Sequence, residues 1–146
     1  MKLFILGIFT MILFVSAPTI KPITGKWKTI DDETNKPKSI VKIYKAKNGK
    51  IYGKIIKLFK EPDEDQDPIC DKCTDYRKDK KIIGMVIIKG LEPDGDEWYA
   101  DDAILDPNNG KIYDCKMWID EDDNDILNVR GYIGWFFRTQ TWHRVK

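Results

Sequence analysis

The sequence predicts an all-β fold, a single antiparallel up-and-down β-barrel of about eight strands. Three observations support this prediction. Apolar residues recur at every second position in short runs, turns rich in Gly, Pro, Asn and Asp separate the runs, and no sustained helical period follows the N-terminal segment. A meander of hairpin-connected strands exposes two edges, so it must close on itself or form a sandwich.

Each predicted strand is a run of alternating residues that ends at a turn signal. The strands are expected at residues 25–30, 39–46, 50–58, 82–91, 97–105, 111–119, 127–133 and 139–145. Asn48 and Gly49 favour the positive φ angles of a tight hairpin turn, and Asn109 with Gly110 favours a longer one. Asp-rich and Glu-rich turns are expected at residues 92–97 and 120–125.

The parity of apolar residues indicates which side chains face the barrel interior. Cys115 and Met117, for example, share one face of their strand, opposite Asp114 and Lys116. A barrel lined in this way is either filled with side chains or holds a small ligand, and the pattern is compatible with both. The candidates for lining a ligand cavity are Val41, Ile43, Leu105, Tyr113, Met117, Leu127 and Val129.

The N-terminal segment has the pattern of a secretory signal peptide at residues 1–17. Lys2 precedes an apolar run at residues 3–15, and the small residues Ser16 and Ala17 follow it. The run is shorter than the roughly 20 residues that a membrane-spanning helix needs. We therefore expect an exported protein, periplasmic or extracellular, with one domain at residues 18–146 and no integral membrane anchor after cleavage.

Charge gives no indication of a nucleic-acid partner. Loss of the leader removes only Lys2 from the 25 basic residues of the chain and none of the 24 acidic ones. The expected mature chain therefore has no formal net charge, and nothing attracts it generally to nucleic acid or to an anionic membrane.

Several stretches resemble a known family. They are "TGKWKTIDDETNKPKSIVKIY", "GKIYGKIIKL", "PICDKCTD", "IIGMVIIKGL", "AILDPNNGKIYDCKM" and "VRGYIGWFFRTQTWHRV". In this order they resemble the bacterial domain-of-unknown-function family 2147 (DUF2147), known for exported proteins. The resemblance implies a lipocalin-like, or calycin-like, antiparallel barrel, and it implies no established biochemical role.

Lipocalin-like proteins carry a Gly-x-Trp motif on the first strand, and an arginine of the last strand often covers the indole at the base of the barrel. The chain has Gly25 and Trp27 in this motif, and Arg138 and Arg144 near its end. A guanidinium on the indole face would contribute about 0.5 to 2 kcal/mol. These four residues are the candidates for closing the barrel.

Cys70 and Cys73 lie in a long polar segment and permit three interpretations. A zinc site would need Cys115 and His143 as further ligands, with a spacing that matches no standard zinc pattern. Redox catalysis requires a lowered thiol pKa, whereas the preceding acidic run at residues 63–67 raises it. The third interpretation is a structural disulfide, the usual fate of cysteines in exported proteins.

The disulfide has alternative pairings. Chain entropy gives about 2 kcal/mol for a Cys70–Cys73 bridge and about 4 kcal/mol for a link from Cys70 to Cys115. Cys115 lies on the apolar face of its strand, where a buried free thiol is expected. Proximity favours the Cys70–Cys73 bridge, with links to Cys115 as the alternative.

The aromatic residues also have two interpretations. They are Trp27, Trp98, Trp118, Trp135 and Trp142, with Tyr132, Phe136 and Phe137. Trp135, Phe136 and Phe137 follow Tyr132 in a segment with two glycines. They form either ordinary barrel core, which we favour because aromatic side chains dominate small cores, or a cavity wall or exposed docking patch. Residues 77–81 carry charges of both signs and are expected to form a solvated loop.

The sequence offers little for catalysis or metal binding. His143 is the single histidine, and Ser39 is the single serine after the leader. The acidic turn at residues 120–125 lacks the glycine and the glutamate of a calcium loop. We therefore expect no catalytic residues, no metal and no cofactor.

Three functional hypotheses remain. The favoured one is a non-enzymatic exported barrel that binds a small, mostly apolar ligand. The second is an envelope structural or protein-interaction module with a filled barrel, which meets its partner through residues 132–137 or the cysteine loop. The third is a thiol-redox factor that uses Cys70 and Cys73.

Overall fold

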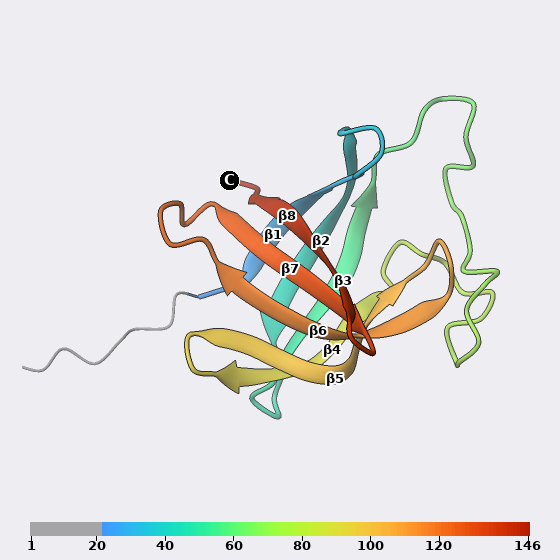
Figure 1. Ribbon diagram of the computed structural model, residues 1–146. Helices are drawn as coiled ribbons and strands as arrows, with labels where there is room; N and C mark the ends of the chain where they lie inside the picture. The colour runs from blue at the N-terminus through green and yellow to red at the C-terminus, as the bar shows by residue number, and fades with distance from the viewer. Residues whose placement is uncertain (1–21) are drawn as a thin grey trace, which may run out of the picture.

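The computed structural model describes residues 22–146, and the predicted signal peptide lies outside the described residues. The fold is a closed barrel of eight antiparallel strands paired in chain order, as the sequence predicts, and β1 pairs with β8 to close it (Figure 1). The strands are β1 (Gly25–Ile30), β2 (Pro37–Lys45), β3 (Ile51–Leu58), β4 (Val86–Asp94), β5 (Glu97–Asp106), β6 (Lys111–Ile119), β7 (Ile126–Ile133) and β8 (Phe136–Arg144). Among residues 22–146, no helix has the length and apolar character required to cross a membrane.

Two strands begin three or more residues away from the predicted position, β4 ends at Asp94, three residues later than predicted, and the other boundaries agree to within two residues. Strand β4 begins at Val86 because the preceding residues belong to the β3–β4 loop, where the Ile82 N–H donates to the Pro68 carbonyl and Gly84 has a φ of 88°. Strand β8 begins at Phe136 because a two-residue turn joins it to β7. Gly134, with a φ of 55°, supplies the left-handed conformation that such a turn requires.

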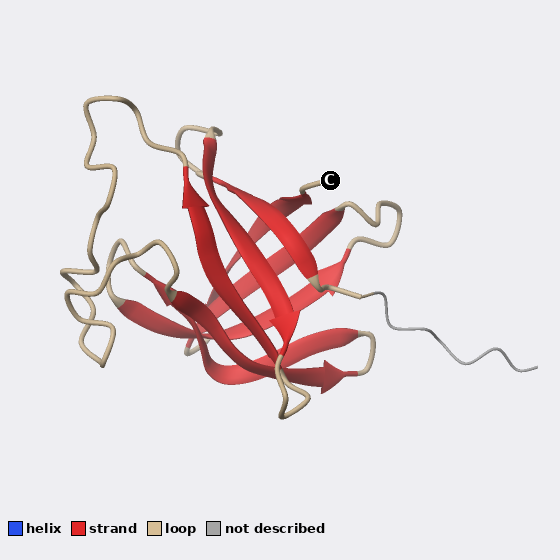
Figure 2. Cartoon of the chain, turned by 180° about the vertical axis from the view of Figure 1, so that it is seen from behind, coloured by secondary structure: helices blue, strands red, loops and turns tan. Residues whose placement is uncertain are grey.

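Alternation of strand direction gives the barrel two different ends. The chain enters at one end, which also carries the β2–β3, β4–β5 and β6–β7 turns; we call it the Trp27 end. The other end carries the β1–β2, β5–β6 and β7–β8 turns and the long β3–β4 loop at residues 59–85; we call it the loop end. This loop stands away from the strands in both views (Figures 1 and 2).

The core lies inside the barrel and is closely packed. Strand β3 passes near β4 at Gly53, where an added Cβ would lie 2.7 Å from Ile88 Cδ1 and 3.2 Å from Val41 Cγ1. Those distances are shorter than van der Waals contact, so a glycine is required where the Ile88 side chain crosses the interior. Side chains therefore fill the barrel at this level.

Candidate functional site

The Trp27 end is closed by an indole and a guanidinium. The Trp27 Nε1–H donates to the Ile23 carbonyl at 2.8 Å, and the Arg144 guanidinium lies 4.1 Å from the indole centre. Arg144 also donates to the carbonyls of Pro22 at 3.3 Å, Thr24 at 3.2 Å and Asn124 at 3.1 Å. These bonds hold the N-terminal segment and the β6–β7 turn over the base of the barrel.

Gly25 fits this arrangement for two reasons. Its φ is 136°, a backbone conformation that residues other than glycine rarely adopt. An added Cβ would also lie 3.1 Å from Arg144 Nη1. The other candidate arginine, Arg138, lies elsewhere. It forms an ion pair with Asp32 of the β1–β2 turn, at the loop end of the barrel.

The predicted ligand-lining residues are packed side chains of the core. Val41, Ile43, Leu105, Met117, Leu127 and Val129 expose at most 3% of their surface. A side chain without accessible surface touches neither solvent nor an internal space that could hold a water molecule. Tyr113 is half-buried, and its hydroxyl accepts a hydrogen bond from the Asn109 side chain at 2.9 Å. A ligand among these residues would require core side chains to move.

Cys70 and Cys73 form a disulfide, which confirms the favoured pairing. Cys115 is free and fully buried on β6, and burial raises the pKa of its thiol far above the usual range. The zinc interpretation fails because disulfide sulfurs are not thiolate ligands. Among residues 22–146, no three His, Cys, Asp or Glu side chains gather in a group that could hold a metal ion.

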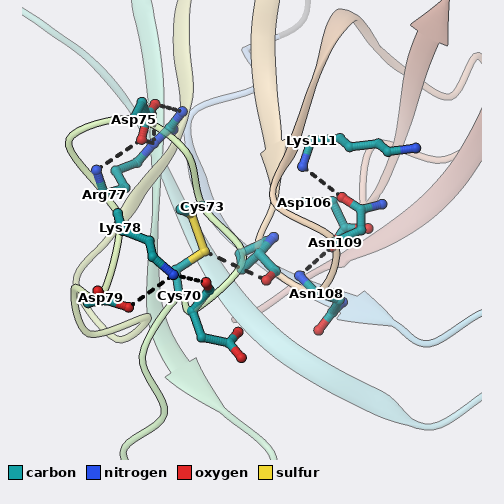
Figure 3. The surroundings of a disulfide bond; sticks show 12 residues. Cys70, Cys73, Asp75, Arg77, Lys78, Asp79, Asp106, Asn108, Asn109 and Lys111 are labelled. Carbon is teal, nitrogen blue, oxygen red and sulfur yellow. Dashed lines mark hydrogen bonds and ion pairs between the residues drawn. A yellow bond between two sulfur atoms is a disulfide. The ribbon is translucent and has the colours of Figure 1, made fainter.

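The disulfide segment packs against the β5–β6 turn (Figure 3). A Cβ added to Gly110 would lie 1.9 Å from the Lys72 carbonyl oxygen, and Gly110 has a φ of 71°. The Cys70 sulfur lies 3.7 Å from the Pro107 carbonyl oxygen. Both disulfide sulfurs are therefore buried between two loops, although the segment is rich in charged residues.

Arg77 fixes the same loop to β4, and the prediction of a fully solvated loop at residues 77–81 is wrong for it. Only 4% of Arg77 is exposed. Its guanidinium donates to the Asp75 carboxylate at 2.7 Å and to the Val86 carbonyl at 3.0 Å. The Arg77 hydrogen bond holds the pKa of Asp75 below its usual range. No sequence signal distinguished this arginine from the lysines that follow it.

Three exposed aromatic residues gather at the tip of the β7–β8 hairpin, whereas Phe59 and Tyr76 are exposed on the β3–β4 loop. Trp135, Phe136 and Phe137 expose 85%, 64% and 61% of their surface, so the interpretation as barrel core is wrong for these three, whereas it holds for Trp27 and Trp142. The reason is the register. The last β6–β7 pair is Asp114 with Tyr132, so the tip lies past the point where the pairing with β6 stops.

The aromatic side chains of this tip contact one another. The rings of Trp135 and Phe136 are stacked with centres 4.5 Å apart. Phe137 lies 6.0 Å from the Tyr132 ring and 4.5 Å from the Arg130 guanidinium. We call residues 133–137 the aromatic tip. Exposed apolar surface of this kind marks an interaction site.

The surface of residues 22–146 has hollows, and none of the predicted lining residues contributes to the two described next. One, of about 270 Å³, lies at the Trp27 end beside Arg144. The other, of about 370 Å³, lies outside β5, β6 and β7 and is lined by Asp94, Tyr99, Asp114, Lys116, Tyr132 and Gly134. Tyr99 donates to the Asp101 carboxylate at 2.6 Å, and this bond raises the pKa of Tyr99 to about 12.

The fold and the covered Trp27 define a lipocalin-like protein. The chain is similar in structure to protein HP1028 from the human pathogen Helicobacter pylori, which is described as belonging to the lipocalin family. The two share 19% identity with a TM-score of 0.68, over 86% of this chain and 84% of that one. A comparison with curated proteins gives no match.

Residues 25–144 match the model of a family described as uncharacterised proteins conserved in bacteria, DUF2147. The chain belongs to this family. The match spans all eight strands, so the resemblance seen in the sequence is confirmed and the barrel accounts for it.

Proposed function

We propose that the protein is an exported, non-enzymatic binding module that contacts another protein through the loop end of its barrel. The single observation that carries this proposal is the contrast between the interior and the aromatic tip. Val41, Met117, Leu127 and the other buried residues of the interior are packed together, whereas Trp135, Phe136 and Phe137 lie in solvent.

The energetic cost of this exposure supports a recognition role. Burial of one large aromatic side chain stabilises a folded protein by about 2 kcal/mol. Three exposed aromatic side chains do not contribute this stabilisation. Aromatic residues are also enriched among those that dominate binding energy at protein interfaces. A hairpin that carries them toward solvent therefore suits a partner surface.

A small apolar ligand receives less support. A lipocalin-like fold is compatible with small-ligand binding, but the predicted lining residues leave no water-sized space beside Val41, Met117 or Leu127. Binding inside the barrel would first require the core to open. A fold alone does not assign a ligand.

Enzymatic and redox roles also receive less support. The Ser39 hydroxyl forms a hydrogen bond of 2.8 Å with the Thr29 hydroxyl. His143 lies on β8 opposite Lys28 of β1. The Cys70–Cys73 sulfurs are buried under the β5–β6 turn, so a reductant has no direct access.

The test is site-specific photo-crosslinking in the cells that produce the protein. A photoreactive phenylalanine derivative replaces Trp135 in one variant and Lys47 in another; Lys47 lies in the β2–β3 turn at the opposite end. We expect a discrete crosslinked product from position 135 only. Excess protein with the native tip should compete with it, and the double variant W135S/F136S should not. Crosslinking that is equal at both positions, or absent at position 135, would contradict the proposal.

A further inference from the structure

The two strands that close the barrel pair over a short length. Strands β1 and β8 are in register only at Trp27 with Arg144 and at Lys28 with His143. Strands β7 and β8, in contrast, pair over eight residue pairs that end at Ile133 with Phe136. Residues 136–142 of β8 therefore have no strand beside them on the β1 side in the described part of the chain. The two strands diverge in this region (Figure 1).

The hydrogen bonds near the C-terminus show which backbone groups face the gap. The Arg144 N–H donates to the Asp125 carbonyl, on the β7 side, and the Val145 N–H donates to the Lys26 carbonyl of β1. In an antiparallel strand, successive residues direct their backbone groups to opposite sides, and β8 has no bulge along β7. The N–H and C=O groups of Phe137, Thr139 and Thr141 therefore face the gap.

Such a row of donors and acceptors is the complement of an extended strand. Proteins usually protect a free sheet edge with charges, bulges or a covering segment, because it templates pairing with another chain. Here the Asp32 side chain crosses the gap. The Asp32 carboxylate, from the β1–β2 turn, accepts hydrogen bonds from Arg138 and from the Gln140 side chain at 2.8 Å.

This contact also indicates the charge of an incoming strand. Arg138 already binds a carboxylate at the edge, and Gln140, which links Asp32 to the buried Trp142 through a bond of 3.2 Å, supports that carboxylate from the other side. Asp32 thus occupies the position that an aspartate or glutamate of a partner would take. The aromatic tip adjoins the edge, with Phe136 on the inner face of β8 and Phe137 on the outer face.

We propose that the β8 edge from Phe137 to Thr141 binds an extended strand of another protein, with a carboxylate of that strand on Arg138 in place of Asp32. This inference rests on the proposed interaction function and specifies how the partner is held. Backbone hydrogen bonds provide affinity, and the contacts to Arg138, Phe136 and Phe137 select the partner sequence. Asp32 acts as an intramolecular competitor for the same site.

The test uses a displayed library of random linear dodecapeptides, selected on the purified protein with its disulfide intact. We expect enriched peptides to place an acidic residue between β-branched or aromatic residues. Binding of synthetic copies should protect the Phe137, Thr139 and Thr141 amides from hydrogen exchange. No enrichment, or protection that maps elsewhere, would overturn the inference.

Matched variants separate the backbone contribution from the side chains. Thr139→Pro and Thr139→Val both remove the hydroxyl that accepts from Arg130, but only proline removes the N–H that faces the gap. We expect the proline variant to bind at least about tenfold more weakly and the valine variant to bind within about twofold of the native chain. Equal binding by the two variants would overturn the inference.

Two further measurements address alternative outcomes. If Thr139→Pro fails to fold, methylation of alternate backbone nitrogens in the peptide tests the same ladder with the native chain, and unchanged affinity would overturn the inference. Asp32→Asn should bind acidic peptides about fivefold more tightly, because the competitor is weakened. If Asp32 only stabilised the fold, Asp32→Asn would bind the peptides no more tightly than the native chain. That result would contradict the role of Asp32 as a competitor.

The remaining outcomes distinguish this inference from the proposed function. If light scattering shows a homodimer that Thr139→Pro abolishes, the edge binds a second copy of the chain. That result would overturn the inference that the strand comes from another protein. A specific crosslink at position 135 that is unaffected by Thr139→Pro would support the proposed function and contradict the strand-addition mode. Absence of that crosslink, with edge binding to peptides retained, would contradict only the proposed function.

Discussion

The Arg144 guanidinium lies 4.1 Å from the centre of the Trp27 indole and donates hydrogen bonds to three backbone carbonyls around it. A single side chain thus joins the last strand, the first strand and the β6–β7 turn. Arginine suits this position because its planar group stacks on a ring while its donors point outward along the plane. Lysine has neither property.

Arg144→Ala should therefore lower the free energy of unfolding by about 2 kcal/mol, from the lost stacking and the lost hydrogen bonds together. Urea unfolding followed by tryptophan fluorescence measures the change. Arg144→Lys keeps the charge and should recover less than half of the loss. Full recovery by lysine would show that charge alone matters at this position.

Gly53→Ala should destabilise the barrel by about 1 to 3 kcal/mol, because the added Cβ would lie 2.7 Å from Ile88 Cδ1. Ile88→Val removes that methyl group and alone should cost about 1 kcal/mol. In the double variant the two losses should be less than additive, as measured by urea unfolding. An unchanged stability in Gly53→Ala would indicate free space inside the barrel.

Removal of the Cys70–Cys73 bridge should cost about 2 kcal/mol, the value expected for a ring of this length. The double variant C70S/C73S should also expose residues 59–85 to limited proteolysis, since the bridge shapes the segment that packs on Gly110. A reductant present during urea unfolding reaches the sulfurs once the chain opens, so it should lower the unfolding midpoint of the native chain and leave that of the variant unchanged. An identical unfolding midpoint for both chains would contradict a structural role for the bridge.

Asp75→Asn should cost about 2 kcal/mol at pH 7, because Arg77 then loses a charged partner while it stays buried. The pKa of Asp75 is lowered in the folded state by its hydrogen bond to Arg77. Its stabilisation is therefore complete above the unfolded pKa of about 3.9 and is lost as pH falls through the lower folded pKa. Urea unfolding between pH 7 and pH 3 should show the two chains converging at the acidic end. A difference that stays constant with pH would exclude this pair as its source.

Much of the fold was predictable because strand alternation and turn residues are local signals. The Asn-Gly turns, the inward parity of Met117 and Cys115 and the motif around Trp27 each needed only a few neighbouring residues. The predicted start of β8 is three residues too late because Phe136 and Phe137 are adjacent apolar residues. They break the alternation of apolar and polar residues that indicates a strand.

The functional surface was less predictable because it depends on register. Whether Trp135 is buried depends on where the pairing of β7 with β6 stops, and whether Thr139 has a backbone partner depends on how far β1 follows β8. The pairing of Asp32 with Arg138 joins residues distant in the chain, and the burial of Arg77 depends on its contact with β4. No local pattern encodes these relationships.

The most direct test of a filled barrel that acts through its surface is native mass spectrometry of protein purified gently from the cells that produce it. We predict that the native mass of the monomer equals its denatured mass, because no space beside Val41, Met117 and Leu127 holds a ligand. A small molecule that is retained in the native spectrum and released on denaturation, in the native chain and equally in W135S/F136S, would contradict this prediction and place the function inside the barrel.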